Sequence, residues 1–517
     1  MITEYAWLVP MVVLLPLVGA GLTLAAARKT WVQRVVSMSV LIGMLACASV
    51  LLWAADTLGP QVMYVGGWTP FEGITLVVDR LSALMVIVST TVTMAVLAYS
   101  IGQGASSFDD ESDGHSPLPV FHPSLLVLSA GVTTTFVSGD LFHIYVGFEM
   151  LLAASFVLLT LGGTVERVRS GITYVQVSLL SSMIFLMALG LVYGATGTIN
   201  LALLSQRVGE ISPGTAALLH VMLLVGFAVK AAVFPMSGWL PDSYPTAPAP
   251  VTAVFAGLLT KVGIYAIIRT QTLLFPQSRF EDLLLWAALF TMVVGILGAI
   301  AQDDIKRMLS FTLVSHIGYM LFGIALGSTH GLGSAIFYVV HHILIQTTLF
   351  LVVGLVERVG GSSDSTRLGD LARISPVVGI LFFIPAMNLA GIPPFTGFLG
   401  KVGLIQAGVS DGSWLAYTVV VGSVVTSLLT LYAVAKVWGR SFWSENATGL
   451  TGAGPMRGGH HSALGLGVLA PTTGLVVVGV ALTVVAGPLF GVASRAAVDL
   501  VQRTPYLEAV LGSGVSL

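Results

Sequence analysis

The chain has 517 residues, of which 56% are apolar and only 9% are charged, and its mean hydropathy is +0.94. This composition excludes a water-soluble globular protein and predicts a polytopic integral membrane protein. The net charge is −2, and we expect the lipid bilayer, not nucleic acid, as the surrounding partner.

Apolar segments long enough to cross about 30 Å of hydrocarbon recur along the whole chain. They predict an all-α fold with about fourteen transmembrane helices. The predicted spans are 5–25, 31–54, 77–101, 123–139, 140–162, 170–195, 214–240, 249–273, 281–300, 306–327, 331–357, 372–408, 414–438 and 464–490. The first span follows the acidic Glu4 rather than basic residues, so we interpret it as a retained helix and not as a signal peptide.

The loops between the spans carry an uneven share of Lys and Arg. With the amino terminus outside, about thirteen of these residues fall on the inner side and about six on the outer side. Because cytoplasmic loops carry an excess of both residues, this bias predicts a multi-pass protein of the cell membrane with both termini on the outer face. The loop 102–122 contains the acidic run 108–113 and is expected to be a solvated connector.

Three lysines, Lys230, Lys261 and Lys401, lie inside apolar spans, and Glu149 lies inside another. A charge at the centre of a membrane helix costs about 2.5–3.5 kcal/mol on the insertion scale, so these residues are functional candidates. Burial disfavours the ammonium form of a lysine, whereas a nearby carboxylate favours it. Making and breaking a contact between Glu149 and a buried lysine would therefore move a proton, which predicts a proton pathway. A static buried ion pair is the alternative.

Other polar residues in apolar spans extend this hypothesis. His316, His341 and His342 are expected to relay protons between the lysines, since histidine exchanges protons near neutral pH. The alternative is a histidine that only hydrogen-bonds between helices. Asp140 begins a span, either as a supporting polar residue or as a helix cap. Asp79 and Arg80 open another span and are expected to pair with each other.

Two distant segments share the order proline, large apolar residue, hydroxyl residue, glycine, aromatic residue and leucine. They are 235–240, with Pro235 and Ser237, and 394–399, with Pro394 and Thr396. Proline removes a helical hydrogen bond, so each segment predicts a broken helix. Paired broken helices mark the two repeats of many transporters. Two kinks that only serve packing are the alternative.

The broken helices suggest a division of the chain into four parts. We expect an N-terminal three-helix segment with the acidic loop at 1–122, a first repeat at 123–273, a second repeat at 281–438, and a C-terminal loop, last helix and short tail at 439–517. Each repeat contains five spans. An odd number of spans makes consecutive copies inverted in the membrane, so we expect the function between or within two inverted repeats.

Three motifs carry a resemblance to a known family. They are Gly-Asp-Leu-Phe-His-Ile-Tyr-Val-Gly-Phe-Glu at 139–149, Trp-Leu-Pro-Asp-Ser-Tyr-Pro-Thr-Ala-Pro at 239–248 and Leu-Thr-Lys-Val-Gly at 259–263. In these motifs the chain resembles the antiporter-like subunits shared by respiratory complex I, membrane-bound hydrogenases and Mrp-type multisubunit Na+/H+ antiporters, and it looks like the Mrp D-subunit version. The resemblance implies a subunit that translocates protons together with other subunits, with Na+ as the exchanged cation. It also implies that Glu149, Lys230, Lys261 and Lys401 hold the protons.

The chain departs from the family pattern at one place. Where members often carry a lysine soon after the histidine of helix eleven, this chain has Gln346, so one relay station is missing from the pattern. Lys401 separates the chain from the complex I member that has a glutamate there, and only a short amphipathic tail, 491–517, follows the last span. Two alternatives remain at this point: a proton-pumping subunit of a complex I-type or hydrogenase-type redox complex, and a non-conducting scaffold.

Several kinds of catalysis have no residues to support them in this sequence. The single Cys47 excludes an internal disulfide and a cysteine-ligated cluster, so we expect neither a cofactor nor a metal. The sequence also contains no glycine-rich phosphate loop and no serine in an elbow motif. A secondary ion transporter subunit is therefore favoured over an enzyme.

Overall fold

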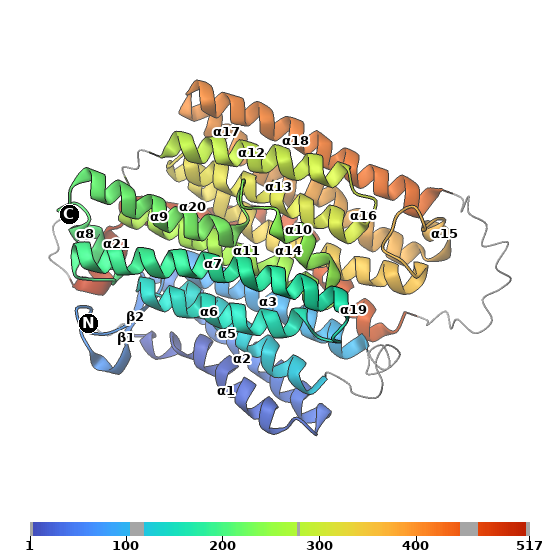
Figure 1. The fold of residues 1–517 in the computed structure, drawn as a ribbon, viewed down its shortest axis with the longest axis horizontal. Helices are drawn as coiled ribbons and strands as arrows, with labels where there is room; N and C mark the ends of the chain where they lie inside the picture. Colours follow the sequence, from blue (N-terminus) through green and yellow to red (C-terminus); the bar gives the residue numbers. More distant parts are fainter. Residues whose placement is uncertain (1–3, 104–117, 277–279, 445–463, 513–517) are drawn as a thin grey trace.

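The computed structural model describes residues 4–103, 118–276, 280–444 and 464–512. Most of the acidic connector predicted at 102–122 therefore lies outside the described residues. The described chain forms a bundle of long, roughly aligned helices, and its two termini lie at the same end (Figure 1). We refer to this end as the termini end and to the other as the opposite end.

Thirteen helices among the described residues are long and apolar enough to span a membrane. These spans contain α1 (Met11–Ala25), α2 (Thr30–Thr57), α3 (Arg80–Gln103), α5 (Leu118–Val137), α6 (Leu141–Leu159), α7 (Val165–Thr196), α9 (Pro213–Ala231), α11 (Ala249–Arg269), α12 (Glu281–Ile300), α13 (Ile305–Ala325), α14 (Thr329–Gly360), α18 (Trp414–Trp438) and α19 (Leu466–Val484). The fourteenth predicted span is divided between α16 (Pro376–Ala390) and α17 (Thr396–Asp411). The predicted helical membrane fold is thus confirmed.

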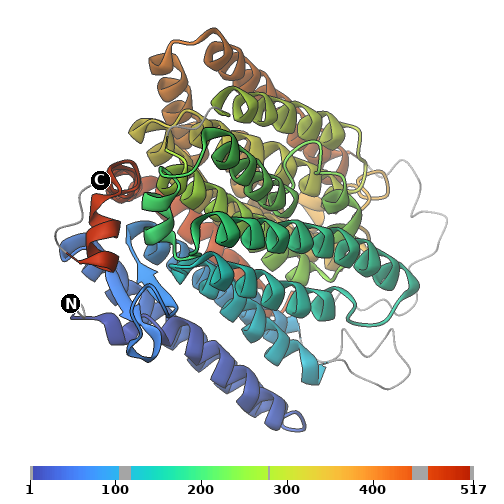
Figure 2. The ribbon, with the colours of Figure 1, turned by 60° about the vertical axis from the view of Figure 1, so that its left-hand side comes forward.

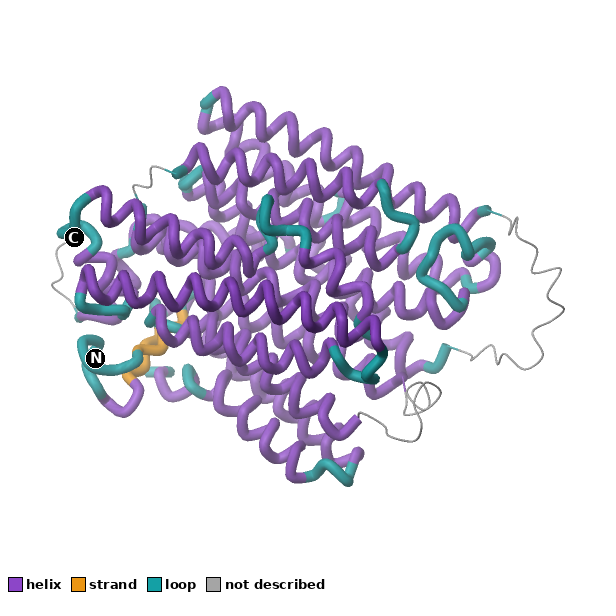
Figure 3. The backbone as a smooth tube through the Cα atoms, in the orientation of Figure 1, coloured by secondary structure: helices purple, strands orange, loops and turns teal. Residues whose placement is uncertain are grey.

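Two of the predicted spans are broken at their prolines, as the sequence indicated. α9 ends at Ala231, and a non-helical segment separates it from the short helix α10 (Trp239–Ser243). α16 ends at Ala390, where Gly391 takes a φ of 85°, and α17 follows after the prolines. Figure 3 shows such loop segments within the length of the bundle. Side chains satisfy part of the freed backbone, since the amide of Phe234 donates a hydrogen bond of 3.0 Å to Thr291 Oγ1 of α12.

Helix α11 lies in the core of the bundle, and all of its residues are buried. It approaches α14 so closely that a Cβ added to Gly257 would lie 2.3 Å from Thr347 Oγ1. It also approaches α9, where a Cβ on Gly263 would lie 2.8 Å from the amide nitrogen of Ala231. Small residues permit these contacts between membrane helices. They bring the helices that carry Lys230 and Lys261 into direct contact.

A two-stranded antiparallel sheet lies near the termini end, and the all-α prediction did not include it (Figure 2). Strand β1 (Gln61–Tyr64) pairs with β2 (Thr75–Val78), with Gln61 opposite Val78. Its strands are short and lie in the connection between two spans, so the hydropathy pattern did not reveal them. The remaining short elements are η1 (Ala6–Leu8), η2 (Val65–Gly67), α8 (Leu201–Arg207), η3 (Tyr244–Thr246), η4 (Thr270–Leu274), α15 (Leu371–Ile374) and η5 (Gly439–Trp443).

The tail that follows the last span folds into two helices, α20 (Ala486–Gln502) and α21 (Thr504–Leu511). The side of α20 that contains Ala493 and Ala497 is buried, and the helix packs against α14. The hydroxyl of Tyr64 in β1 donates a hydrogen bond of 2.8 Å to the carbonyl oxygen of Val510. The amphipathic tail is therefore packed onto the termini end of the bundle.

The predicted pairing of Asp79 with Arg80 is wrong. Asp79 forms an ion pair with Arg269 of α11 at 2.6 Å, whereas Arg80 pairs with Asp56 at 2.7 Å and with Asp499 of α20 at 2.5 Å. Consecutive residues at the start of a helix point in different directions, so they find different partners. Sequence adjacency was therefore a poor guide to contact.

Candidate functional site

The seven ionisable residues that the sequence predicted lie on six different helices. Six of the side chains are buried and Glu149 is partly buried. They are Glu149 on α6, Lys230 on α9, Lys261 on α11, His316 on α13, His341 and His342 on α14, and Lys401 on α17. The structure groups them into a Glu149–Lys230 pair and a larger cluster between Lys261 and Lys401.

Glu149 and Lys230 form no direct ion pair, contrary to the contact that the sequence suggested. The Nζ of Lys230 lies 5.6 Å from the ring centroid of Phe148, the residue next to Glu149. Neither Lys230 Nζ nor Glu149 Oε1 has a hydrogen-bond partner among the described residues. The two groups still attract each other electrostatically. A buried charge without a partner is costly, so both groups require hydration or movement.

Lys261 lies between the Glu149–Lys230 pair and the histidines. Its Nζ donates a hydrogen bond of 2.6 Å to the carbonyl oxygen of Ala256, five residues earlier in α11. The neighbouring Thr260 Oγ1 is buried without a hydrogen-bond partner among the described residues. The only acceptor assigned to the Lys261 ammonium within the described chain is thus a neutral carbonyl, which leaves its charge uncompensated.

The three histidines cluster around Tyr338 of α14. His316 Nδ1 and the Tyr338 hydroxyl lie 2.7 Å apart, and the ring centroids of His316 and His342 are 5.2 Å apart. The ring of His341 lies 5.4 Å from that of Tyr338. Both lysines, Lys261 and Lys401, act electrostatically on His316 and on His342. The cluster therefore lies between the two lysines.

His341 connects the cluster to the second helix break. Its Nδ1 lies 2.9 Å from Thr396 Oγ1, the first residue of α17. Thr396 in turn donates to Asn388 Oδ1 of α16 at 3.2 Å, and that oxygen also accepts from the amide of Gly397 at 2.9 Å. Because the threonine proton is directed to Asn388, His341 Nδ1 acts as the donor to Thr396.

Lys401 is held by the broken helix itself. Its Nζ donates hydrogen bonds to the carbonyl oxygens of Leu389 and Ala390, at 3.2 and 2.9 Å, at the end of α16. It also donates to Ser427 Oγ of α18 at 2.9 Å. The ring of Tyr319 lies 5.0 Å below the ammonium. Carbonyls at a helix C-terminus carry partial negative charge, so they stabilise the cation without a carboxylate.

Gln346 occupies the place of the missing lysine on α14. Its Nε2 donates a hydrogen bond of 2.7 Å to the carbonyl oxygen of Leu309, and its Oε1 is buried without a partner among the described residues. His342 lies one helical turn before it on α14, and neither ring nitrogen of His342 has a hydrogen-bond partner in the described chain. These orphaned atoms mark a polar interior that the protein alone does not satisfy.

The remaining predicted residues have local roles in the structure. Asp140 caps α6, since its Oδ1 accepts hydrogen bonds from the amides of Phe142 at 2.7 Å and His143 at 3.1 Å. Burial raises the pKa of Asp140 to about 6, although these amides oppose the shift. Pro235 and Pro394 are exposed in the breaks, and Ser237 is buried.

Sequence reasoning missed several polar residues that complete the cluster. They are Tyr319, Tyr338, Asn388 and Ser427. Tyr338 had a usable signal, because it precedes His341 and His342 by three and four residues and therefore shares their helix face. Single polar residues such as Asn388 are common in membrane helices, and nothing in the sequence distinguished this one.

Comparisons with known proteins agree over most of the chain. The family model for the transmembrane region of NADH:quinone oxidoreductase and Mrp antiporters matches residues 138–430. The D-type subunit of a Na+/H+ antiporter from Alkalihalophilus pseudofirmus is 35% identical over 507 residues, which cover 98% of this chain and 99% of the relative. The protein of the same name from Bacillus subtilis is 33% identical over 84% of this chain and 86% of its own.

Solved structures show the same similarity in three dimensions. A chain of the Mrp complex from Dietzia sp. is 32% identical, with a TM-score of 0.89 over 99% of this chain and 100% of that chain. A chain of a membrane-bound sulfane sulfur reductase, an archaeal respiratory complex, has a TM-score of 0.85 over 98% of this chain and 100% of its own. At 23% identity, the second match shows a shared fold alone.

Proposed function

Because the chain belongs to the NADH:quinone oxidoreductase/Mrp antiporter family, we propose that it is the proton-translocating D-type subunit of a multisubunit Na+/H+ antiporter. It is a transporter subunit rather than an enzyme. Its partners are the other subunits of a hetero-oligomeric membrane complex, and H+ and Na+ are the exchanged ions.

The histidine and tyrosine cluster between Lys261 and Lys401 carries this proposal. Three histidines and a tyrosine hydroxyl lie within a few ångströms of one another, in a part of the molecule where apolar side chains would otherwise fill the space. Histidine can accept and release a proton near neutral pH. A scaffold has no need of such a cluster, because buried polar groups cost free energy unless they are paired.

The residues divide the work of moving a proton. Lys230 and Lys261 hold protons in the first half, and the position of Glu149 determines whether the charged form of Lys230 is favoured. His316, His341 and His342 relay the proton across the place that Gln346 occupies. Thr396 then links His341 to the break where Lys401 is held. Each step changes the charge that the next group experiences, which couples the two halves.

Water is the natural partner for the orphaned polar atoms along this path. Lys230 Nζ, Glu149 Oε1 and both ring nitrogens of His342 lack hydrogen-bond partners among the described residues. A buried water typically makes about three hydrogen bonds to groups of this kind. Hydration would therefore both satisfy these atoms and carry protons between them.

The redox-complex alternative retains the same chemistry but changes the source of energy. The relatives that cover nearly the whole chain at more than 30% identity are named antiporter subunits, and this favours cation exchange. Copurifying subunits separate the two: small membrane subunits support an antiporter, and quinone or iron–sulfur subunits support a redox complex.

The orientation and the internal repeat remain part of the proposal. Both termini lie at one end of the bundle, as an even number of spans requires. The excess of Lys and Arg in the other loops supports the outer face of the cell membrane for that end. The paired breaks after Ala231 and Ala390 support inverted repeats at 123–273 and 281–438, flanked by the segments 1–122 and 439–517.

Antiport in everted membrane vesicles tests the proposal. Lys230→Ala and Glu149→Ala are expected to lower Na+-driven proton exchange by at least about tenfold, which corresponds to about 1.4 kcal/mol. Lys436→Ala is the matched control, because Lys436 lies at the opposite end and donates to the Ile300 and Gln302 carbonyls and to Asp303. Assembly of the complex is measured in parallel. Normal exchange in both Lys230→Ala and Glu149→Ala would contradict the proposed roles.

A further inference from the structure

A polar stripe runs along one face of α11 from Lys261 towards the termini end. Lys261, Tyr265 and Arg269 are spaced four residues apart, so they lie on the same side of the helix, about one turn from one another. All three are buried. The proton pathway described above uses only Lys261 and leaves the rest of this stripe unexplained.

Tyr265 and Arg269 form a closed hydrogen-bond network with α3 and α5. The hydroxyl of Tyr265 donates to the carbonyl oxygen of Phe136 at 2.6 Å and lies 3.0 Å from Ser82 Oγ. Arg269 Nε donates to the same hydroxyl at 3.0 Å, and Arg269 Nη2 donates to Ser82 Oγ at 2.9 Å. Three helices therefore meet at a polar junction.

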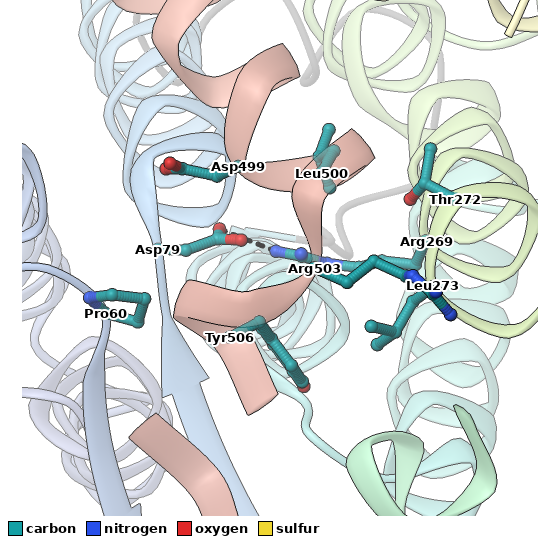
Figure 4. Close-up of a pocket in the computed structure, with 9 residues that line it drawn as sticks. All are labelled: Pro60, Asp79, Arg269, Thr272, Leu273, Asp499, Leu500, Arg503 and Tyr506. Atoms are coloured by element: carbon teal, nitrogen blue, oxygen red, sulfur yellow. Dashed lines mark hydrogen bonds and ion pairs between the residues drawn. The ribbon is translucent and has the colours of Figure 1, made fainter. Parts of the chain in front are cut away.

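The junction ends in a buried ion pair. Arg269 Nη2 lies 2.6 Å from Asp79 Oδ1, and the two side chains are only 2% and 5% exposed. Tyr506 of α21 covers the guanidinium, whose central carbon lies 5.3 Å from the centre of its ring. A small cavity touches both members of the pair and is otherwise lined mainly by the C-terminal helices, with Asp499, Arg503 and Tyr506 (Figure 4).

A buried ion pair is a poor choice for simple anchoring. Desolvation of the two charges offsets most of their attraction, and well-packed apolar side chains often stabilise as well or better. The C-terminal helices are already attached by other contacts, among them the ion pair of Arg80 with Asp499 at 2.5 Å. The Asp79–Arg269 pair thus has a location and a cost that anchoring does not explain.

Lys261 points away from this junction. Its Nζ binds the carbonyl of Ala256, which lies towards the start of α11, whereas Tyr265 and Arg269 lie towards the end. The polar stripe is therefore closed at both Tyr265 and Asp79 in this structure. Rotation of the lysine side chain and separation of the ion pair would together make the stripe continuous.

We propose that the Asp79–Arg269 pair is a closed gate, and that its opening gives Lys261 a hydrated route to the aqueous phase at the termini end. Tyr506 is the lid of this gate. The inference rests on the proposed function, because a route from Lys261 has a purpose only if Lys261 exchanges protons. It adds a branch that leaves the first half directly, without passing through the histidine cluster.

Cysteine accessibility in the assembled complex tests the gate. In a Cys47→Ser background, Ser89→Cys places a thiol on the face of α3 that contains Ser82, about two turns deeper. Ser89 is buried, at 2% exposure. A membrane-impermeant thiol reagent is added separately to each side of the vesicle, and a cleavable tag on the C-terminus identifies the termini side.

We expect Ser89→Cys to be unreactive when the gate is intact. Arg269→Ala or Tyr506→Ala should raise its labelling rate from the termini side at least about tenfold, a change of about 1.4 kcal/mol in accessibility. Arg495→Ala is the matched control, because Arg495 pairs with Asp56 at the same end without touching the gate. It should leave the thiol unreactive.

Three outcomes would overturn the gate. They are equal labelling in all backgrounds, no labelling in either gate variant of an assembled complex, and labelling from the opposite side only. If Arg269→Ala does not assemble, Tyr506→Ala alone decides. Labelling does not depend on exchange, so this result stands apart from the antiport of Lys230→Ala and Glu149→Ala.

Discussion

The ammonium of Lys401 donates a hydrogen bond of 2.9 Å to the carbonyl oxygen of Ala390, across the break between α17 and α16. A proline-induced break frees carbonyls that a continuous helix would use internally. Here those carbonyls hold a buried cation. The same interruption therefore ends one helix and builds the site that retains the lysine.

The first prediction concerns this lysine. Lys401→Met is expected to lower Na+-driven proton exchange by at least about tenfold, since hydrogen bonds to a charged group are worth about 1.5–3 kcal/mol each. Ser427→Ala removes one acceptor of the same ammonium and should have a smaller effect. Exchange is measured in everted vesicles that contain equal amounts of assembled complex. A larger loss in Ser427→Ala than in Lys401→Met would refute this ranking.

The second prediction isolates one hydroxyl in the histidine cluster. Tyr338→Phe removes the group that lies 2.7 Å from His316 Nδ1 and keeps the ring. A neutral hydrogen bond contributes about 0.5–1.5 kcal/mol, so we expect a reduction in exchange rate of about two- to tenfold. Tyr174→Phe is the control, because its buried hydroxyl bonds Ser155 instead, at 2.7 Å. Equal rates in the two variants would remove Tyr338 from the relay.

The third prediction asks which residue bridges the place of the missing lysine. Gln346→Leu leaves the carbonyl of Leu309 without its donor and should destabilise the protein by about 1–3 kcal/mol. It is nevertheless expected to retain more exchange than His342→Ala, one turn away on the same helix. Thermal unfolding and vesicle exchange are measured on both variants. If Gln346→Leu abolishes exchange and His342→Ala does not, the glutamine is the relay.

The fourth prediction concerns stability and pH. Burial raises the pKa of Asp140 to about 6, so its contribution to stability is complete below its ordinary pKa and is lost as the pH rises through about 6. Asp140→Asn retains a side chain suited to a helix N-cap but no longer titrates. The variant should therefore lose less stability than the wild type between about pH 4 and 6.5. Thermal unfolding of the purified complex at both pH values measures this, and parallel losses would contradict it.

The sequence revealed the parts of the site that are costly in a membrane. Lys230, Lys261 and Lys401 were recognisable because a charge in an apolar span requires a reason. The two breaks were recognisable because proline cannot continue a helix. Both signals depend on local chemistry alone, so they did not require knowledge of the fold.

Contacts between distant segments were not available from the same reasoning. Asp79 pairs with Arg269, which lies 190 residues away, and no local pattern indicates that partner. Lys230 and Glu149 were expected to touch, but the way their helices pack leaves them apart. Side-chain partners follow from how helices meet, and that depends on small residues spread over the whole chain.

The contact between Gly257 and Thr347 has a consequence for how the subunit works. A Cβ on the glycine would lie 2.3 Å from the threonine hydroxyl, so there is no slack between α11 and α14. Helices that interlock this tightly cannot slide or rock past one another without breaking the contact. The scaffold must stay still while rotamers and solvent rearrange inside it, and a pair of spin labels across this seam should report one unchanging separation throughout turnover.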